Sequence, residues 1–365
     1  MKAYVDGAAV SLETAAAKAA RLLETAQLPV IAGLGTDVAG TRAAIRLAEK
    51  LRGAYDHLAS DVLLRDIDVM RQAGRMVTTA NDVRLRADCL LFIGPKLSEA
   101  WPDLAERLDL SARPRLAAEK APRKIFWLGP GRGEAAALGA TEIAASPAAL
   151  PLAVAALRAA VLDRKTRSDG SSAQKLKDLA AALKAAHFGA VVWSAESLDR
   201  LTIEMIGGLV FDLNQKTRCS NLPLVSGLNA YGVVQTSGWM TGFPPRTGFG
   251  RGYPEHDTWR FDAMRMIEAG EADAALWISS YAAEAPKWKR QVPLIALAQP
   301  QTRLPYAPQV RIDVGAPGRD HDAIEYSRDI ATFTLAKATR ASNAPQVAEV
   351  VALIDAKLAK GSEAC

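Results

Sequence analysis

The chain has 365 residues, 49% of them apolar and 23% charged, so it can bury a sizeable core in two or three packed units and is not disordered as a whole. Its formal net charge of +5 is small and spread along the sequence, which does not indicate nucleic-acid binding. No apolar run reaches the roughly 18 residues of a membrane span, and a short strand and a turn lie where a signal peptide has its apolar core, so we expect a cytoplasmic protein with no membrane partner.

The first 56 residues predict an opening helix followed by a β-turn-α-β unit. Ser11 is placed to cap a helix that runs to about Thr25. The continuous apolar run at 28–33 (LPVIAG) is typical of a buried parallel strand. A glycine-rich turn at 33–40, a second helix and a strand at 53–56 follow. A crossover between two such parallel strands is right-handed.

The glycine-rich turn leaves two interpretations open. Gly33, Gly35 and Gly40 partly match the GxGxxG pattern of dinucleotide-binding proteins, and Asp56 lies about 20 residues further on, where those proteins carry an acid. The third glycine comes late, however, and a tight strand-to-helix turn explains the same residues. We favour the turn and keep a stand-alone dinucleotide-binding enzyme as an alternative.

Strands and helices continue to alternate up to the C-terminus. The predicted strands cover 75–77, 89–94, 124–128, 190–193, 222–225, 274–279, 293–298 and 310–314. The predicted helices cover 147–162, 173–186, 197–213, 261–269 and 344–360, the last with Ser342 or Asn343 as its N-cap. Residues 164–170 are polar and turn-rich, which makes them a candidate linker. The alternation predicts an α/β fold with mostly parallel sheets.

One long segment, Leu228–Pro254, does not fit this alternation. It reads LNAYGVVQTSGWMTGFPPRTGFGRGYP, and it is rich in glycine, proline and aromatic residues without helical or strand periodicity. Long irregular segments inside a regular chain are more often binding loops than connectors. We therefore predict an irregular binding loop here.

The cysteines and histidines do not form a recognisable metal site. The three cysteines, Cys89, Cys219 and Cys365, are too far apart in sequence for a CxxC pair of zinc or iron–sulfur ligands. Cys89 lies in an apolar run and is expected in a buried strand. The histidines are equally scattered and are expected to be surface or packing residues: His57, His187, His256 and His321.

The spacing of residues in 228–254 resembles the B subunit of formylmethanofuran dehydrogenase, a member of the molybdopterin oxidoreductase superfamily. The matching positions are Asn229, Gly232, Trp239, Thr241, Gly242, Phe243, Pro244, Phe249, Arg251, Gly252, Tyr253 and Pro254. Gln235 stands where the family tends to carry an acid. Segments 30–35, 44–56 and 270–280 extend the resemblance over nearly the whole chain.

The resemblance implies two interleaved Rossmann-like three-layer units with mostly parallel sheets, plus a C-terminal helix. Residues 1–57 and 225–325 would form the first, discontinuous unit, and 58–224 the second. A C-terminal segment, 326–365, would contain the helix at 344–360.

The departures from the family concern its redox site. The family binds tungsten or molybdenum through a cysteine or selenocysteine near the position of Val62, and an aliphatic side chain cannot replace that thiolate. Asp61 and Asp66 are nearby oxygen donors that solvated helix-end carboxylates explain equally well. The family's Arg-Gly-His is replaced by residues 225–227 (VSG), and an expected acid is replaced by Tyr281. We therefore expect neither a molybdenum or tungsten pterin nor a 4Fe–4S centre.

These losses are known in the B-type (β) subunit of the formyltransferase/hydrolase complex of methylotrophic bacteria. By resemblance, that complex converts formyl-tetrahydromethanopterin to formate through formyl-methanofuran without redox chemistry. The chain would be a structural subunit without catalytic or metal-binding residues. Its partners would be an amidohydrolase-like alpha subunit, a formyltransferase subunit and a C-type subunit.

The resemblance also gives a remnant pterin-side loop, retained for folding and contacts: Asn229, Gly232, Gln235, Trp239, Thr241, Gly242, Arg251 and Gly252. We expect Arg251 to brace this loop or a subunit contact rather than a substrate. An active molybdenum or tungsten subunit of formylmethanofuran dehydrogenase, with ligands from elsewhere, remains an alternative.

Overall fold

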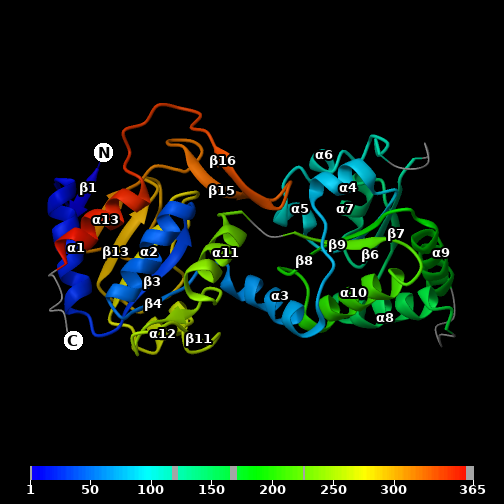
Figure 1. Cartoon of the computed structure of the whole chain (residues 1–365), viewed down its shortest axis with the longest axis horizontal. Coiled ribbons are helices and arrows are strands. Elements are labelled where there is room, and N and C mark those ends of the chain that lie inside the picture. The colour runs from blue at the N-terminus through cyan, green and yellow to red at the C-terminus, as the bar shows by residue number, and fades with distance from the viewer. Residues whose placement is uncertain (1, 117–121, 165–170, 225–226, 359–365) are drawn as a thin grey trace. The chain divides into compact units, whose positions relative to one another are not determined.

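The computed structural model describes residues 2–116, 122–164, 171–224 and 227–358 (Figure 1). The chain forms two compact units, each assembled from separate segments. The first contains Met1–Ser60, Leu228–Tyr326 and Phe333–Cys365, and the second contains Asp61–Gly227 and Ser327–Thr332. The division expected from the sequence instead treats 326–365 as a segment of its own and sets the boundaries at 57 and 225.

The first unit is built on a nine-stranded sheet in the order β11-β10-β4-β3-β12-β13-β14-β1-β2. The central strands are parallel: β4 (Ala54–Tyr55), β3 (Pro29–Gly35), β12 (Ala274–Ser279), β13 (Leu294–Ala298) and β14 (Val310–Asp313). The edges are antiparallel: β1 (Ala3–Val5), β2 (Ala8–Val10), β10 (Thr247–Gly248) and β11 (Glu255–His256). The central strands are almost wholly buried, as a sheet covered on both faces requires.

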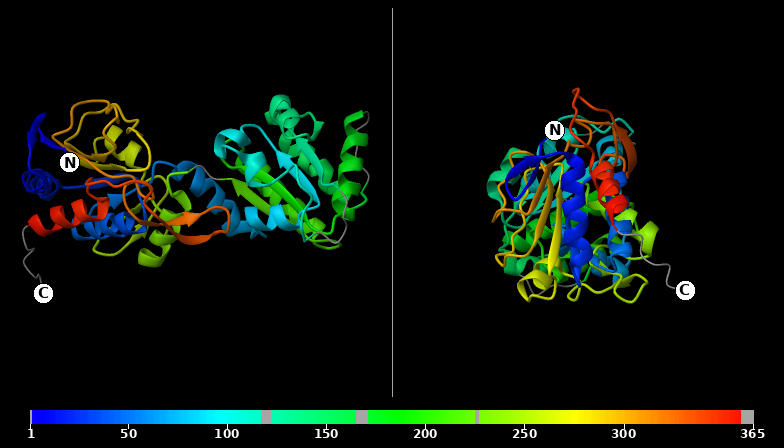
Figure 2. Two further views of the ribbon diagram at one scale, coloured as in Figure 1. Left: turned by 90° about the horizontal axis from the view of Figure 1, so that it is seen from above. Right: turned by 90° about the vertical axis from the view of Figure 1, so that its left-hand side faces the viewer.

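Helices cover both faces of this sheet (Figure 2). One face carries α1 (Leu12–Thr25), α2 (Val38–Lys50), α11 (Ala230–Thr241) and α13 (Val347–Lys357), which share a hydrophobic core with the strands. The other face carries α12 (Ala263–Glu268), whose buried side chains share a second core with Trp277 and Trp288. Within the described residues, no helix is long and apolar enough to cross a membrane.

The second unit has a five-stranded parallel sheet in the order β7-β6-β5-β8-β9. The strands are β7 (Thr141–Ile143), β6 (Lys124–Leu128), β5 (Cys89–Ile93), β8 (Gly189–Ser194) and β9 (Cys219–Leu224). One core joins the sheet to α3 (Ser60–Ala73), α8 (Leu150–Val161), α9 (Ser171–Ala185) and α10 (Arg200–Leu213). The opposite core joins it to α4 (Ala80–Arg86), α5 (Leu97–Ala100), α6 (Leu104–Arg107) and α7 (Arg132–Ala137). The predicted α/β class with two Rossmann-like units and mostly parallel sheets is confirmed.

Some predicted elements differ in the structure. The strand predicted at 75–77 is only an isolated bridge between Val77 and Asn221. The last helix is shorter than 344–360 because Gln346, not Ser342 or Asn343, caps it through a reciprocal capping box with Glu349. The predicted linker lies almost wholly outside the described residues. The sequence prediction missed α3 and a hairpin made of β15 (Ala323–Ser327) and β16 (Thr332–Ala336).

The prediction of an irregular loop at Leu228–Pro254 is wrong for its first half. That half contains the 12-residue helix α11. The helix buries small and hydroxyl-bearing residues, namely Ala230, Gly232, Val233, Thr236 and Ser237. Because few of these are apolar, the sequence shows no hydrophobic periodicity, although the buried face is continuous.

Gly33 does not form the strand-to-helix turn predicted for it. It lies inside β3, at a bulge where β3 has one residue more than β12 between two paired positions. Its φ of +86° is in the left-handed region, and Leu34 follows with φ of +50°. A Cβ atom on Gly33 would lie 2.5 Å from the Ile278 carbonyl oxygen of β12. Only glycine fits this position without moving the central strands.

Replacing Gly33 by alanine should therefore lower the free energy of unfolding by about 1–3 kcal/mol or more, through strain and overpacking. Gly207→Ala is a matched control, because Gly207 lies within α10 and a Cβ there meets no atom within 4 Å. That substitution should be neutral or stabilise the chain by up to about 1 kcal/mol. Urea unfolding followed by circular dichroism measures both, and equal stability of the two variants would contradict the assignment of the bulge.

Candidate functional site at the carboxyl end of the first sheet

The topology of the first sheet identifies one position for a ligand. After β3 the chain passes through α2 to β4 on one side, whereas β12 lies on the other side of β3. In open α/β sheets, ligands bind outside the carboxyl ends of the strands at such a reversal. The polar residues at the carboxyl ends of β3 and β12 are buried: Thr36, Asp37, Ser279 and Ser280. We therefore take the carboxyl ends of β3 and β12 as the candidate crevice.

Asn229 is hydrogen-bonded to the backbone at these strand ends. Its Nδ2 donates to the Thr36 carbonyl (3.0 Å), and its Oδ1 accepts from the Tyr326 backbone N–H (2.9 Å). Its backbone has φ of +56°, a left-handed conformation that asparagine tolerates better than most residues. A Cβ atom on Gly232 would lie 2.0 Å from Asn229 Oδ1. Asn229 and Gly232 therefore act together. Because Gly232 has no side chain, it leaves room for the Asn229 amide that bridges the two backbone segments.

Tyr281 lies two residues after the end of β12. Its hydroxyl donates to Glu325 Oε2 of β15 at 2.8 Å. Burial and the neighbouring Glu325 carboxylate raise the pKa of Tyr281, so the phenol remains a neutral donor. The position at which the family is expected to carry an acid therefore holds a side chain that is committed to an internal hydrogen bond.

The other residues predicted for the pterin-side loop on α11 shape the helix. Gln235 is half-buried, and Trp239 is 65% exposed. Thr241 donates from its hydroxyl to the Ser237 carbonyl (2.8 Å). Gly242 ends the helix with φ of +81°.

Arg251 and Gly252 lie elsewhere, in the connection between β10 and β11 at the edge of the sheet. Arg251 forms an ion pair with Glu255, with Nε 2.9 Å from Oε2, and its guanidinium lies 5.1 Å from the Tyr253 ring centre. Gly252 has φ of +87° and donates to the Phe249 carbonyl (2.7 Å). The eight predicted residues therefore do not surround one site.

Two consecutive residues after β4, Asp56 and His57, are buried, and the sequence analysis did not predict their burial. Asp56 Oδ2 accepts from the Ala263 N–H (3.0 Å) and lies 3.4 Å from Arg246 Nε. Burial raises the pKa of Asp56 to about 6, and Arg246 offsets part of that rise. His57 is 2% exposed, and its Nδ1 accepts from the Ala59 N–H (3.0 Å). Burial lowers the pKa of His57 to about 4, so the ring is neutral at pH 7 with its proton on Nε2.

Dinucleotide binding does not fit this geometry. A dinucleotide places its pyrophosphate at the N-terminus of the helix after the first strand. Here the Asp37 carboxylate caps α2 by accepting from the Gly40 N–H (2.9 Å), so a negative charge already occupies that position. Asp56, the candidate ribose ligand, is bound to Arg246 and Ala263.

A metal held by a protein thiolate does not fit either. Val62 packs against the core of the second unit, and Asp66 is not solvated as expected but buried in an ion pair with Arg75 (2.6 Å). Cys89 and Cys219 lie in strands of the second sheet, where burial raises the pKa of each thiol to about 12. In the described part of the chain, no three His, Cys, Asp or Glu side chains are grouped as metal ligands. Residues 225–226 and Cys365 lie outside the described residues.

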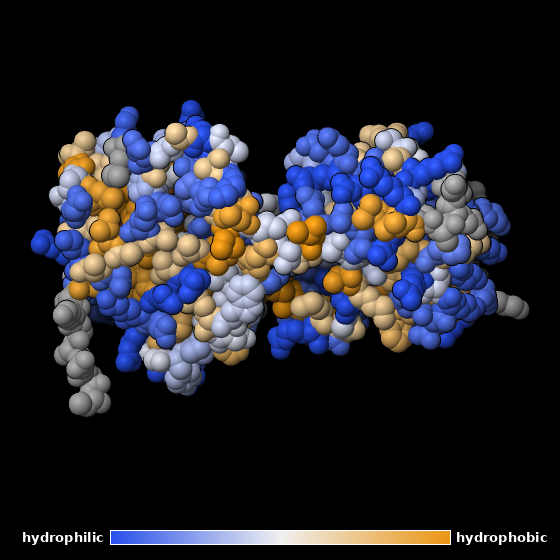
Figure 3. Space-filling view, turned by 45° about the horizontal axis from the view of Figure 1, so that its top comes forward, coloured by the Kyte–Doolittle hydropathy of each residue, from blue (hydrophilic) through white to orange (hydrophobic). Residues whose placement is uncertain are grey.

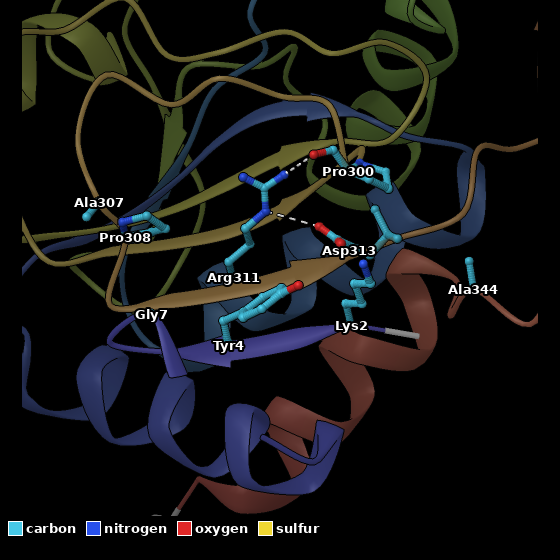
Figure 4. A pocket seen from close by; sticks show the side chains of 10 residues that line it. Lys2, Tyr4, Gly7, Pro300, Ala307, Pro308, Arg311, Asp313 and Ala344 are labelled. Carbon is cyan, nitrogen blue, oxygen red and sulfur yellow. Dashed lines mark hydrogen bonds and ion pairs between the residues drawn. The ribbon is translucent and has the colours of Figure 1, made fainter. Parts of the chain in front are cut away.

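A separate pocket of about 560 Å³ lies beside β14 and β1 (Figure 4). Its most prominent cation, Arg311, is held internally. Its Nε lies 3.0 Å from Asp313 Oδ1, and its Nη2 donates to the Pro300 carbonyl (2.6 Å). Because the guanidinium is already hydrogen-bonded to the loop that follows β13, Arg311 is not free to bind an anion in the pocket.

Comparison with known proteins gives relatives along the whole chain. The sequence is 35% identical over 356 residues to the B subunit of the formyltransferase/hydrolase complex Fhc of Methylorubrum extorquens, covering 96% of this chain and 95% of that protein. It is 26% identical to the B subunit of tungsten-containing formylmethanofuran dehydrogenase 2 of Methanocaldococcus jannaschii, covering 90% of this chain and 79% of that protein. No family model matches. The fold and these relatives define an α/β protein similar to the B subunits of formylmethanofuran dehydrogenases.

A solved structure narrows this class. A chain in the crystal structure of the formyltransferase/hydrolase complex (FhcABCD) of Methylorubrum extorquens, in complex with methylofuran, superposes with a TM-score of 0.88. The two chains are 34% identical, and the match covers 98% of each. This chain belongs to the family of the Fhc B subunit, which confirms the resemblance found in the sequence.

Asn229→Ala should remove both bridging hydrogen bonds and leave the partners on Thr36 and Tyr326 unpaired, at a cost of about 1–3 kcal/mol in the free energy of unfolding. Asn343→Ala is the control, because Asn343 is exposed and should change stability by less than about 0.5 kcal/mol. Urea unfolding measures both. Equal stability of the two variants would show that the bridge contributes nothing.

His57 should make stability depend on pH. Its pKa is about 4 in the folded chain against 6.5 ordinarily, so the unfolded chain takes up a proton first as the pH falls. The free energy of unfolding should therefore fall by about 1.5 kcal/mol more in the wild type than in His57→Asn between pH 6.5 and 5. Asp56, whose pKa is raised, acts in the opposite direction, since its contribution is lost as the pH rises through about 6. It is present in both proteins, so their difference isolates His57, and parallel pH profiles would contradict the prediction.

Proposed function

We propose that this chain is the B-type subunit of a formyltransferase/hydrolase complex and that it acts there as a non-redox, non-catalytic structural subunit. The complex would transfer the formyl group of formyl-tetrahydromethanopterin to methanofuran or a close analogue and hydrolyse the product to formate. The relative of known structure belongs to a complex of this name, bound to methylofuran. The subunit would work in the cytoplasm.

The observation that carries this proposal is the set of internal hydrogen bonds at the carboxyl ends of β3 and β12. Asn229 joins the Thr36 carbonyl to the backbone of β15, and Tyr281 is hydrogen-bonded to Glu325 on the same strand. A pterin cofactor at this position would have to displace these side chains and leave their buried polar groups unpaired, which costs about 1–3 kcal/mol for each group.

The absence of a thiolate supports the same proposal. The resemblance implies a cysteine or selenocysteine ligand to the metal near position 62, and the Val62 side chain here packs against a hydrophobic core. We therefore propose that the subunit holds neither a metal pterin nor a 4Fe–4S centre. This separates it from the tungsten-containing relatives and makes an active dehydrogenase subunit the weaker alternative.

The proposed partners are an amidohydrolase-like alpha subunit, a formyltransferase subunit and a C-type subunit. The first two would carry the hydrolytic and transfer chemistry, whereas this chain would contribute surface and rigidity. The well-packed core inside each unit suits that role, because a unit that is already ordered loses little conformational freedom when it assembles.

The purified complex should contain no stoichiometric molybdenum, tungsten or pterin, and it should release formate without reducing a redox dye. Metal analysis by mass spectrometry and fluorescence of oxidised pterin extracts test the first part, and a coupled formate assay tests the second. Tyr281→Phe should leave formate release and assembly unchanged, since it removes only an internal hydrogen bond. One metal per subunit, or dye reduction dependent on the formyl substrate, would overturn the proposed function.

A further inference from the structure

The pocket beside β14 and β1 (Figure 4) has the outer edge of the first sheet as its floor. Tyr4 and Arg311 are partners across these two antiparallel strands, so their side chains lie side by side on one face of the sheet. Ala3, Val310 and Ile312, which alternate with them, point to the other face and into the core shared with α1 and α13. The volume of about 560 Å³ is typical of pockets that hold a small molecule.

The rim of the pocket is held in place by the chain itself. It is formed by the proline-rich loop after β13, which contributes Pro300 and Pro308. Arg311 holds the same loop, because its Nη1 donates to the Thr302 carbonyl (3.2 Å) and its Nη2 donates to the carbonyls of Gln299 (3.2 Å) and Pro300 (2.6 Å). A pocket whose rim is already ordered loses little conformational freedom when it binds a ligand.

The hydrogen bonds of Arg311 determine what its guanidinium offers to a ligand. Its Nε is bonded to Asp313 and both Nη atoms are bonded to loop carbonyls, so all three nitrogens already donate within the plane of the group. The side chain is nevertheless 22% exposed. What it presents to the pocket is therefore its flat face, on which planar π-systems stack.

Lys2 and Tyr4 supply the polar groups that are still available in the pocket. Within the described residues, neither the Lys2 ammonium nor the Tyr4 hydroxyl has a hydrogen-bond or ion-pair partner. The opposite charges of Arg311 and Asp313 offset each other, and Lys2 is the other charged residue that lines the pocket. The pocket therefore has one positive charge that is not neutralised, and a carboxylate complements a single ammonium.

Apolar walls alone do not identify a ligand. Figure 3 shows one face of the molecule, on which apolar side chains reach the surface in patches among hydrophilic ones. Exposed apolar residues of this kind are common in soluble proteins. The ligand class follows instead from the combination of a flat cation, an unpaired ammonium and an unpaired phenol hydroxyl in one pocket.

We propose that the pocket beside β14 and β1 is a binding site for a small aromatic carboxylate. The ring of the ligand lies on the flat face of Arg311, its carboxylate pairs with Lys2, and the Tyr4 hydroxyl donates to it. An aliphatic acid lacks the planar π-system, and a phosphate carries more negative charge than one ammonium neutralises. The site uses residues of this chain alone, so it is independent of the proposed function.

Fluorine NMR titrations of the purified full chain test this site with probes that differ in one property. 4-Fluorobenzoate should bind saturably. 4-Fluorobenzamide has the ring without the charge, and trifluoroacetate has the charge without the ring. Each of these two should bind about fivefold or more weakly than 4-fluorobenzoate, because each lacks one of the two interactions.

Three variants locate the binding in this pocket. Lys2→Gln should weaken binding of 4-fluorobenzoate by about fivefold or more, and Tyr4→Phe by about threefold. Lys2→Gln should also lose the preference for 4-fluorobenzoate over 4-fluorobenzamide. Lys357→Gln is the matched control, because Lys357 is exposed at the end of α13 and does not line the pocket, so its affinity should stay within about twofold of the wild type. Circular dichroism melts should show the same folding transition for all variants.

Three results would overturn the site. The first is equal binding of 4-fluorobenzoate to the wild type and to Lys2→Gln. The second is equal affinity for 4-fluorobenzoate and trifluoroacetate, which would indicate an adventitious ion only. The third is a titration of the wild type that does not saturate. None of these results bears on metal content or formate release of the complex, so failure of this site and failure of the proposed function are distinguishable.

Discussion

The amide of Asn229 is the interaction on which the carboxyl end of the first sheet depends. It joins the segment after β3 to β15, although Thr36 and Tyr326 are far apart in sequence. Both its donor and its acceptor are used, and an apolar residue could replace neither. Gly232 is required in turn, because any Cβ there would collide with this amide. Packing alone therefore explains why asparagine and glycine stand at these two positions.

Buried charge in this chain serves structure in the same way. Asp56 and Arg246 connect the end of β4 to the start of β10, and Asp66 pairs with Arg75 inside the second unit. Removing one partner of such a pair leaves an uncompensated charge in a poorly polarisable interior, which costs far more than the intact pair contributes. Perturbed pKa values often mark active sites. Here Asp56 Oδ2 and His57 Nδ1 accept from backbone N–H groups, whereas Asp56 Oδ1 and His57 Nε2 are buried without a hydrogen-bond partner among the described residues.

The sequence predicts most of the fold because the parallel strands are continuous apolar runs and the helices carry caps. Strands at 124–128 and 274–279 match the observed bounds for that reason. It fails where burial is not apolar: α11 buries Thr236 and Ser237, so no periodicity marks it. It also cannot reveal long-range partners, such as Asp56 and Arg246, which are 190 residues apart. The candidate site was therefore predictable as a stretch of sequence, whereas the bonds that fill it were not.

The proposed loss of redox chemistry is compatible with the retained stretch, because different atoms determine the shape of the stretch and the chemistry of the site. The shape of 228–254 depends on positive φ angles at Asn229, Gly242 and Gly252 and on the pairing of β10 with β4. The thiolate ligand that the resemblance implies for a metal pterin would instead come from the position of Val62, outside this stretch. Selection for folding alone is therefore enough to preserve the residues that shape the stretch.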